Sequence, residues 1–368
     1  MANSAIVDKQ RDDGTGLSFV ALGGIWLDEI CAPGKAALVN VPGGSVAFGM
    51  AAALYLLNVH QFADDSTTAT FGALIFSSIS PKEIGLIVKA GHDFPVILEQ
   101  EFSRWNVNLH ILREIERPSA RGRILYGESA SERTYQRLTQ PLPSTPQDLV
   151  ATDTVSSSCF HFFDVPAVVS TQIDEISTLR AQRGIHHSPV YVWEPQAKSC
   201  SPDTLELHRA AAKKVDIFSP NHAELASFFA GAPAHRAFDT ATVEEQARAL
   251  LPAELPKPLC ILIRCAEHGC FVLSASPDSE ESRWLPAFHP PDSTDVIDPT
   301  GAGNAFLGGA ALGFLKHEDF FTAAAYGSVA ASFAVEVVGL PDVQRCDGEA
   351  RLNTYMNRLG QPLQAFST

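Results

Sequence analysis

The stretch Asp298-Pro-Thr-Gly-Ala-Gly-Asn-Ala-Phe-Leu-Gly-Gly309 lies between a short apolar-bearing segment and a run rich in Ala, Leu and Gly. This order predicts the end of a strand, a glycine turn and a helix over residues 305–315. Gly301 and Gly303 lack a Cβ, so the backbone can turn tightly and approach a ligand closely. The N–H groups at the start of the helix favour an anion, and we expect a phosphate there. A turn that only packs a helix on a sheet is the alternative.

The residues of this turn resemble the signature of ribokinase/PfkB-type carbohydrate kinases, usually Asp-Thr-Thr-Gly-Ala-Gly-Asp-x-Phe-x-Gly-Gly. The resemblance implies that the main chain of Gly301, Ala302 and Gly303 stabilises the phosphoryl group in transit, and that position 304 holds the catalytic base. This chain has Asn304 there, and an amide cannot take up a proton at neutral pH. A general base typically contributes about 10²- to 10⁴-fold, so the difference bears directly on activity.

The acceptor side of the resemblance lies near the start of the chain. Residues 17–28 are an apolar run broken by two glycines, which predicts a buried strand with Asp28 at its carboxyl end. Kinases of this type begin in a similar way, with an Asp that binds substrate hydroxyls. A turn cap is the alternative role for Asp28.

Residues 41–57 lead from a glycine turn into a helix and resemble the second signature of the family. In that signature the two glycines, here Gly43 and Gly44, lie close to the sugar, and a helix entry is the alternative. Phe48 stands where the family usually has an Asn that touches the substrate. An apolar ring at that position argues against a plain sugar as the acceptor.

A small β lid over the substrate is implied for about residues 31–41 and 108–128. Arg121 and Arg123 are then candidates for anion contacts at the lid, with solvated surface arginines as the alternative. Lids of this fold often pair between subunits, so a homodimer through the lid is an expectation. Elsewhere in this half, residues 68–76 read as a strand, and residues 81–90 read as a helix with Pro81 in its first turn.

From residue 155 onward, apolar runs alternate regularly with helix-like segments. Such alternation predicts βαβ units and a parallel sheet, with ligands at the carboxyl ends of the strands. The expected strands are residues 159–165, 190–193, 215–218 and 259–263; the expected helices are 172–182, 203–214, 222–229, 242–251, 305–315, 320–339 and 347–358.

Three of these strand ends carry polar residues worth examining. Trp193-Glu194-Pro195 ends one strand, and the other two carry motifs. Asn221-x-x-Glu224 has the spacing of a helix capping box, and it also resembles the family motif in which Asn and Glu organise Mg²⁺ near the phosphates. The segment from Arg264 to Gly269 looks like the nucleotide-contacting turn of the family, in which Arg264 would meet a phosphate. Ala266 replaces a usual glycine there, a tolerable change if its backbone φ is negative. The resemblance also assigns Asp298 and Thr300 to the nucleotide side of the turn.

Composition limits the classes of protein to consider. A chain of 368 residues with 45% hydrophobic and 19% charged residues is ordinary for a globular protein. The net charge of −15 argues against nucleic acid as the main partner. No stretch suits a membrane helix, and the start lacks a signal-peptide core. The seven cysteines form no Cys-x-x-Cys pair, so we expect them reduced and mostly buried in a cytoplasmic protein.

The expected architecture is a ribokinase-like α/β domain over residues 17–360, with a mostly parallel central sheet flanked by helices. Residues 1–16 are expected to be disordered and residues 361–368 to form a tail. The Pro299 and Asn304 variants most resemble a divergent fungal branch of the family, the maintenance-of-killer type. The resemblance implies an ATP-dependent phosphotransferase, with ATP and Mg²⁺ as cofactors, that acts on a hydroxyl or carboxylate of a small sugar-, nucleoside- or metabolite-like molecule. A non-catalytic nucleotide- or metabolite-binding pseudokinase and an enzyme with other chemistry are the alternatives.

Overall fold

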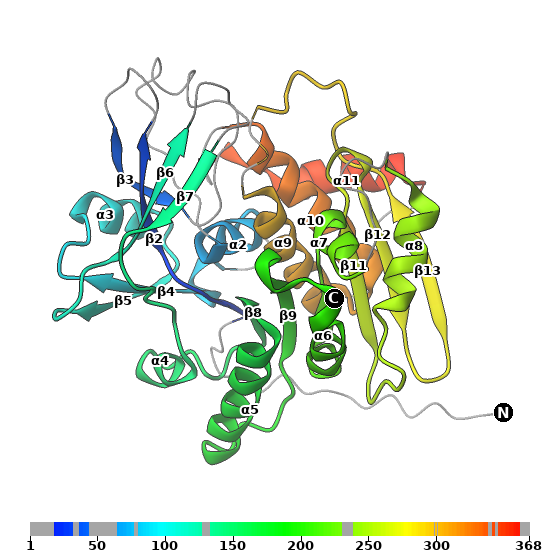
Figure 1. Cartoon of the computed structure of the whole chain (residues 1–368), viewed down its shortest axis with the longest axis horizontal. Helices are drawn as coiled ribbons and strands as arrows, with labels where there is room; N and C mark the ends of the chain where they lie inside the picture. The colour runs from blue at the N-terminus through cyan, green and yellow to red at the C-terminus, as the bar shows by residue number, and fades with distance from the viewer. Residues whose placement is uncertain are drawn as a thin grey trace.

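A nine-stranded sheet forms the centre of the computed structural model, which describes residues 18–31, 37–43, 65–76, 80–126, 133–229, 238–297, 299, 301–337, 341–342 and 345–360. The strand order is β13-β12-β11-β10-β9-β8-β1-β4-β5 (Figure 1). All neighbours from β11 to β5 pair in parallel, whereas β12 and β13 run antiparallel. The parallel strands therefore end at one edge of the sheet. The strands are β1 (Phe19–Leu22), β4 (Ile84–Gly91), β5 (Asn108–Glu114), β8 (Cys159–Asp164), β9 (Val190–Pro195), β10 (Ile217–Phe218), β11 (Leu259–Arg264), β12 (Cys270–Ala275) and β13 (Glu280–Leu285).

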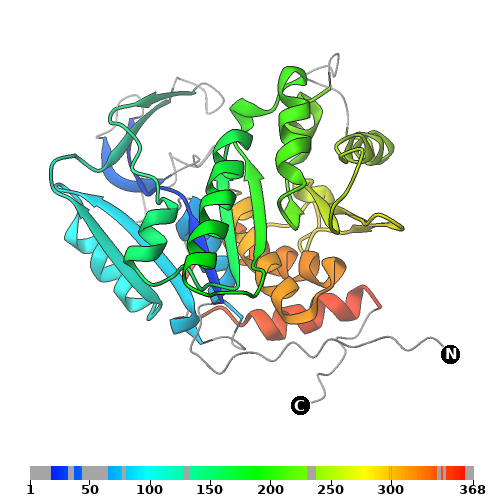
Figure 2. The same ribbon diagram turned by 90° about the horizontal axis from the view of Figure 1, so that it is seen from below.

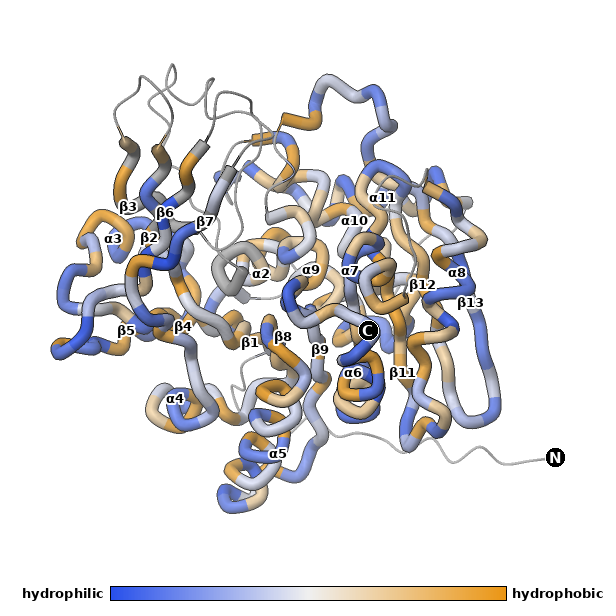
Figure 3. The backbone as a smooth tube through the Cα atoms, viewed as in Figure 1, coloured by the Kyte–Doolittle hydropathy of each residue, from blue (hydrophilic) through white to orange (hydrophobic). Residues whose placement is uncertain are grey.

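Helices cover both faces of this sheet, and each face has its own apolar core. The chain is hydrophobic along buried strands such as β11 and hydrophilic along the outer strand β13 (Figure 3). Helices α5 and α6 lie on one face, and α9, α10 and α11 lie on the other (Figure 2). The helices are α2 (Asp65–Leu74), α3 (Val96–Arg104), α4 (Pro146–Ala151), α5 (Pro166–Gln182), α6 (Leu205–Ala212), α7 (His222–Ser227), α8 (Thr240–Ala249), α9 (Ala302–His317), α10 (Phe320–Val335) and α11 (Gly348–Arg358). This architecture confirms the expected α/β fold.

A second sheet of four strands lies beside β4 and β5, at the end of the molecule away from β13 (Figure 1). Its order is β3-β2-β6-β7, with strands β2 (Trp26–Cys31), β3 (Leu38–Gly43), β6 (Ala120–Tyr126) and β7 (Arg133–Arg137). It corresponds to the small sheet expected from the sequence, with one correction. Residues 108–114 belong to β5 at the edge of the central sheet, because they pair with β4 along their whole length.

Two segments of the amino-terminal half differ from the sequence expectation. Residues 68–76 lie in and just after helix α2 instead of a strand, because this helix packs closely on α9 and its apolar face suits either element. Residues 84–91 form strand β4 instead of a helix. Pro81 starts only one turn of 3-10 helix, and the following apolar run is almost wholly buried, as a central parallel strand requires.

Close backbone contacts fix helix α9 between α2 and α10. A Cβ on Gly308 would lie 1.9 Å from the carbonyl oxygen of Ala69, and one on Gly72 would lie 2.0 Å from the carbonyl oxygen of Ala305. A Cβ on Gly313 would lie 2.8 Å from the side chain of Tyr326. Only glycine permits these approaches, so the glycines of α9 determine where its first turn lies relative to the sheet.

Among the helices in the described part of the chain, none combines the length and apolar character needed to cross a membrane. All seven cysteines are free, and five of them are buried: Cys159, Cys200, Cys260, Cys265 and Cys270.

Candidate functional site

Helix α9 begins at a tight turn that needs glycine. Gly301, the residue before the helix, has φ 76° and ψ −9°, a left-handed conformation that costs most other residues about 1–2 kcal/mol. The amide of Ala302 donates to the carbonyl oxygen of Pro299 at 3.2 Å, and the amide of Ala305 donates to that of Gly301 at 2.9 Å. The helix thus starts at Ala302, three residues earlier than expected, and Asn304 lies in its first turn.

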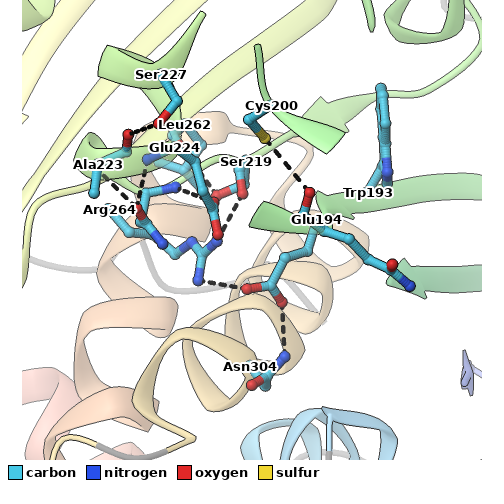
Figure 4. Close-up of polar contacts among 12 residues, drawn as sticks. Trp193, Glu194, Cys200, Ser219, Ala223, Glu224, Ser227, Leu262, Arg264 and Asn304 are labelled. Carbon is cyan, nitrogen blue, oxygen red and sulfur yellow. Dashed lines mark hydrogen bonds and ion pairs between the residues drawn. The ribbon is translucent and has the colours of Figure 1, made fainter. Parts of the chain in front are cut away.

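Asn304 is joined to the carboxylate of Glu194, which the sequence marks only as a polar residue at a strand end. Its Nδ2 donates to Glu194 Oε2 at 2.7 Å, and both side chains are buried, with 5% of each residue exposed. Glu194 is the fifth residue of β9, so it reaches the first turn of α9 from the carboxyl end of a parallel strand. Figure 4 shows the Glu194 side chain between Asn304 and Arg264. The amide of Asn304 is therefore held as a hydrogen-bond donor.

Arg264, the last residue of β11, closes the other side of this cluster. Its Nη1 lies 2.7 Å from Glu194 Oε1, and its Nη2 donates to the carbonyl oxygen of Ser219 at 2.9 Å (Figure 4). The same Nη2 lies 3.6 Å from Glu224 Oε2. A Cβ on Gly303 would lie only 2.1 Å from Arg264 Nη1, so the guanidinium rests on the first turn of α9. The structure thus brings the predicted residues Gly301, Gly303, Asn304, Arg264 and Glu224 together.

Asn221 and Glu224 form the capping box that the sequence predicts as one alternative. Asn221 Oδ1 accepts from the amides of Ala223 and Glu224 at 3.0 and 2.9 Å, and Glu224 Oε2 accepts from the amide of Asn221 at 2.8 Å. Burial raises the pKa of the Glu224 carboxyl, although Arg264 and the Asn221 hydrogen bond oppose the shift. The cap fixes the start of α7, and it uses one carboxylate oxygen of Glu224, Oε2, as a hydrogen-bond acceptor.

His161 lies beneath the cluster and is a residue that sequence reasoning missed. It is fully buried on β8, with Nε2 3.9 Å from Glu194 Oε2. Among the described residues neither ring nitrogen has a hydrogen-bond partner, and the same holds for Arg264 Nε. Burial, helped by the nearby charge of Arg264, lowers the pKa of His161 to about 3, so the ring is neutral. The only sequence signal was a lone His inside an apolar strand.

The turn after β11 corrects one expectation. Ala266 has φ 49°, a left-handed value, so the negative φ that would make the loss of glycine harmless is not present. Gly269 has φ 88° and ψ −135°, and a Cβ there would lie 2.0 Å from the carbonyl oxygen of Leu285. Glycine at 269 thus has a structural cause, and its contact with a nucleotide stays a prediction.

The acceptor side is described only in part. Asp28 lies inside β2, where its backbone pairs with Val41 and Gly122, instead of at the end of one continuous strand, because the chain leaves the central sheet after Leu22. Gly43 ends β3. The predicted residues Gly44, Phe48, Asp298 and Thr300 lie outside the described residues.

Arg121 forms an ion pair instead of facing the central cluster. Its Nη2 and Nε both lie 2.8 Å from Asp93 Oδ2, and a quarter of its side chain is exposed. The backbone amide of Ser119 also donates to Asp93. Burial would raise the pKa of Asp93, but Ser119 and Arg121 outweigh it and hold that pKa at about 2. Anion binding by Arg121 stays a prediction.

The donors of the cluster fit a magnesium ion only in a limited way. In the described part of the chain, no three His, Cys, Asp or Glu side chains are grouped to hold a metal. Glu224 Oε2 is engaged by the Asn221 amide, which leaves Oε1 for a metal-bound water. Mg²⁺ in nucleotide enzymes commonly takes one or two carboxylates and draws its other ligands from phosphates and water. Glu224 Oε1 is compatible with that role, whereas Asn221 Oδ1 already accepts from two backbone amides.

Residues 82–343 of this chain match the model of the pfkB family of carbohydrate kinases. The chain belongs to the pfkB family of carbohydrate kinases. Among curated relatives, MAK32 of Saccharomyces cerevisiae is 28% identical over 297 residues, which are 75% of this chain and 77% of MAK32. An uncharacterized protein of Schizosaccharomyces pombe is 24% identical over 345 residues, 88% of this chain and 86% of that protein. These relatives confirm the likeness to the fungal maintenance-of-killer branch.

Solved structures of pfkB-type kinases share the fold. The ribokinase of Giardia lamblia superposes with a TM-score of 0.62 at 15% identity and covers 94% of this chain and 100% of its own. The adenosine kinase of Schistosoma mansoni in complex with 2-fluoroadenosine gives a TM-score of 0.62 at 12% identity, covering 90% and 99%. Sequence identities this low show a shared fold and nothing about function. Kinases of the family use ATP with Mg²⁺, and this chain has a kinase-type fold.

Proposed function

We propose that the protein is an ATP-dependent phosphotransferase that acts, slowly, on a hydroxyl or carboxylate of a small sugar-, nucleoside- or metabolite-like molecule. The observation that carries the proposal is the convergence of three predicted motifs at the carboxyl edge of the parallel sheet. The turn Gly301–Gly303, Arg264 and the Asn221–Glu224 cap lie within one cluster of contacts. Ligands of open α/β sheets bind at such an edge.

Phosphoryl transfer depends mainly on positioning and on stabilisation of charge, with a base that orients the nucleophile. The main-chain amides of the first turn of α9 supply part of that stabilisation, and Arg264 adds a positive charge beside them. Asn304 can orient an acceptor hydroxyl through Oδ1 while its Nδ2 donates to Glu194, but it cannot remove the proton. We therefore expect turnover lower by about 10²- to 10⁴-fold than with a base at this position. An acceptor that needs little base assistance, such as a carboxylate, fits best.

ATP and Mg²⁺ are the cofactors of this proposal. Mg²⁺ neutralises phosphate charge when it is bound, and Glu224 with Asn221 would hold it through water. Asp28 orients the acceptor in this reading. We expect a small molecule as the partner, and a homodimer through the small sheet remains a prediction, as does a cytoplasmic location.

A second candidate function is nucleotide or metabolite binding without transfer. Two contacts favour this binding function. Arg264 lies against Gly303 and pairs with Glu194, and Asn304 donates to Glu194, so both side chains that would meet a phosphoryl group already have a protein partner.

The test begins with calorimetric titration of the purified full-length protein with ATP and Mg²⁺. A screen of sugars, nucleosides and small acids for phosphorylation follows, with wild type, Asn304→Asp and the double variant Glu194→Gln/Asn304→Asp. Transfer by the wild type supports the phosphotransferase. If only the variants with a carboxylate at position 304 transfer phosphate, the result supports the second candidate, a binding protein without a catalytic base. If no variant binds ATP, the phosphotransferase and the nucleotide-binding alternative are both wrong.

A further inference from the structure

The carboxylate of Glu194 bridges the two groups that are suited to bind a phosphate at the start of α9. One oxygen lies 2.7 Å from the guanidinium of Arg264, and the other accepts from Asn304 in the first turn of the helix at 2.7 Å. A helix N-terminus and an arginine fork both prefer an anion. Here the protein itself supplies a carboxylate to the guanidinium of Arg264 and to the side chain of Asn304 in the first turn.

We infer that Glu194 is a specificity-determining residue whose carboxylate holds the anion position at the start of α9, so that the terminal phosphate of ATP must displace it. This inference rests on nucleotide binding at the proposed site. The consequence is a preference for nucleotides with short phosphate chains. The third phosphate of ATP adds little affinity, because it meets a carboxylate where a cation and amides would otherwise receive it.

The net charge of the cluster supports the inference that Glu194 disfavours a further phosphate. Glu194 and Glu224 share one guanidinium, that of Arg264, at 2.7 and 3.6 Å, and all three side chains are at least nine-tenths buried. His161 is neutral and contributes no positive charge. With both carboxylates ionised, the four side chains carry one net negative charge. Like charges brought together at a buried site cost several kcal/mol.

The unpaired atoms of the cluster argue against a purely structural ion pair. In the described chain Arg264 Nε and both nitrogens of the fully buried His161 lack hydrogen-bond partners. Structural networks usually satisfy such atoms, and buried ion pairs add little stability over apolar residues. Polar atoms left unpaired around a carboxylate indicate that this cluster exchanges partners with a ligand.

The experiment compares adenosine, AMP, ADP and ATP by calorimetric titration, each with Mg²⁺, on full-length wild type, Glu194→Gln and Glu206→Gln. Glu206 is the matched control, because its side chain is 79% exposed on α6 and its replacement changes the net charge equally. Glu194→Gln keeps the shape, and Asn304 can turn its amide to pair with it. We expect wild type to bind ADP at least as tightly as ATP. We expect Glu194→Gln to tighten ATP by roughly ten- to hundred-fold, with a much smaller change for ADP and none for adenosine.

Three results would overturn the inference. Wild type that binds ATP tenfold more tightly than ADP contradicts it without any variant, so the test survives a variant that fails to fold. An unchanged ratio of ATP to ADP affinity in folded Glu194→Gln removes Glu194 from phosphate discrimination. A loss of all nucleotide affinity in that variant would make Glu194 a ligand contact instead. If neither wild type nor variant binds any of the four ligands, the proposed function itself is wrong. If both bind nucleotides with the same ratio of ATP to ADP affinity, only the inference about Glu194 is wrong.

Discussion

Replacing Asn304 by Asp would place a second carboxylate beside that of Glu194, where an amide now donates a hydrogen bond. The present distance between Asn304 Nδ2 and Glu194 Oε2 is 2.7 Å, and both side chains are buried. Two like charges 4 Å apart repel by about 4 kcal/mol at an effective dielectric constant of 20, and this pair would be closer. The attraction of Arg264 to Glu194 would offset part of that repulsion.

The variant can relieve the repulsion by taking up one proton between the two carboxyls. A cost of about 4 kcal/mol corresponds to a pKa raised by roughly 3 units, from near 4 to near 7. A carboxyl whose pKa is raised on folding gives stability that is present at low pH and is lost as pH rises through the folded-state pKa. We therefore expect Asn304→Asp to be nearly as stable as wild type below pH 4, about 1.4 kcal/mol less stable at pH 5 and about 4 kcal/mol less stable at pH 9.

Urea unfolding of both proteins at pH 5, 7 and 9 measures this difference. The double variant Glu194→Gln/Asn304→Asp exchanges the carboxylate and the amide, so its stability relative to wild type should not fall with pH. A difference between Asn304→Asp and wild type that is the same at pH 5 and pH 9 would refute the pairing of residues 194 and 304. The same reasoning affects activity tests, since Asn304→Asp alone adds a proton-sharing pair and only the double variant supplies a clean carboxylate at 304.

Other substitutions check the remaining contacts. Ala266→Gly should stabilise the protein by about 1 kcal/mol in urea unfolding, because the left-handed φ of 49° strains any residue with a Cβ; no gain would mean a relaxed turn. Gly308→Ala should destabilise by about 1–3 kcal/mol or more, because the Cβ would lie 1.9 Å from a backbone oxygen of α2, whereas Gly24→Ala, with 3.4 Å to the nearest atom, should be mild. His161 should make the protein less stable as pH falls below about 6.5, by up to about 1.4 kcal/mol per pH unit, since its pKa is lowered to about 3 in the folded state. His161→Phe should flatten that slope in urea titrations between pH 8 and 5, and an unchanged slope would assign it to other groups.

The carboxyl-terminal half of the fold was predictable because its strands and helices alternate in a regular way. The expected strands at 159–165 and 259–263 became β8 and β11 with ends within one residue. The amino-terminal half was less predictable, since residues 68–76 and 84–91 are both short and almost wholly apolar. Hydrophobic periodicity cannot separate a buried helix from a buried strand in such segments. Helix α2 is fixed by the close approach of Gly72 to Ala305 of α9. These residues are 233 positions apart in sequence, so no local pattern could predict the contact.

The candidate site was predictable to the extent that it consists of local motifs. The glycine turn before Asn304, the Asn221–Glu224 cap and Arg264 at the end of β11 each have a recognisable sequence. His161 belongs to no motif, and Glu194 was marked only as a polar residue at a strand end. Both join the cluster because β8, β9, β10 and β11 lie side by side and end at one edge. Their part in the site depends on the order of strands in the sheet, which the sequence does not encode locally.

The pairing of Asn304 with Glu194 bears on the proposal that Asn304 replaces a catalytic Asp. A chain that had lost only a base would leave a neutral amide beside an arginine and a helix N-terminus, an environment that attracts phosphate. This chain instead has a buried carboxylate within hydrogen-bond distance of both Asn304 and Arg264. The negative charge beside the first turn of α9 is therefore carried by residue 194 of the neighbouring strand, where it faces the cation that would hold a phosphate. We therefore expect Asn304→Asp alone to leave carboxylates at both 194 and 304, whereas Glu194→Gln/Asn304→Asp leaves only the one at 304.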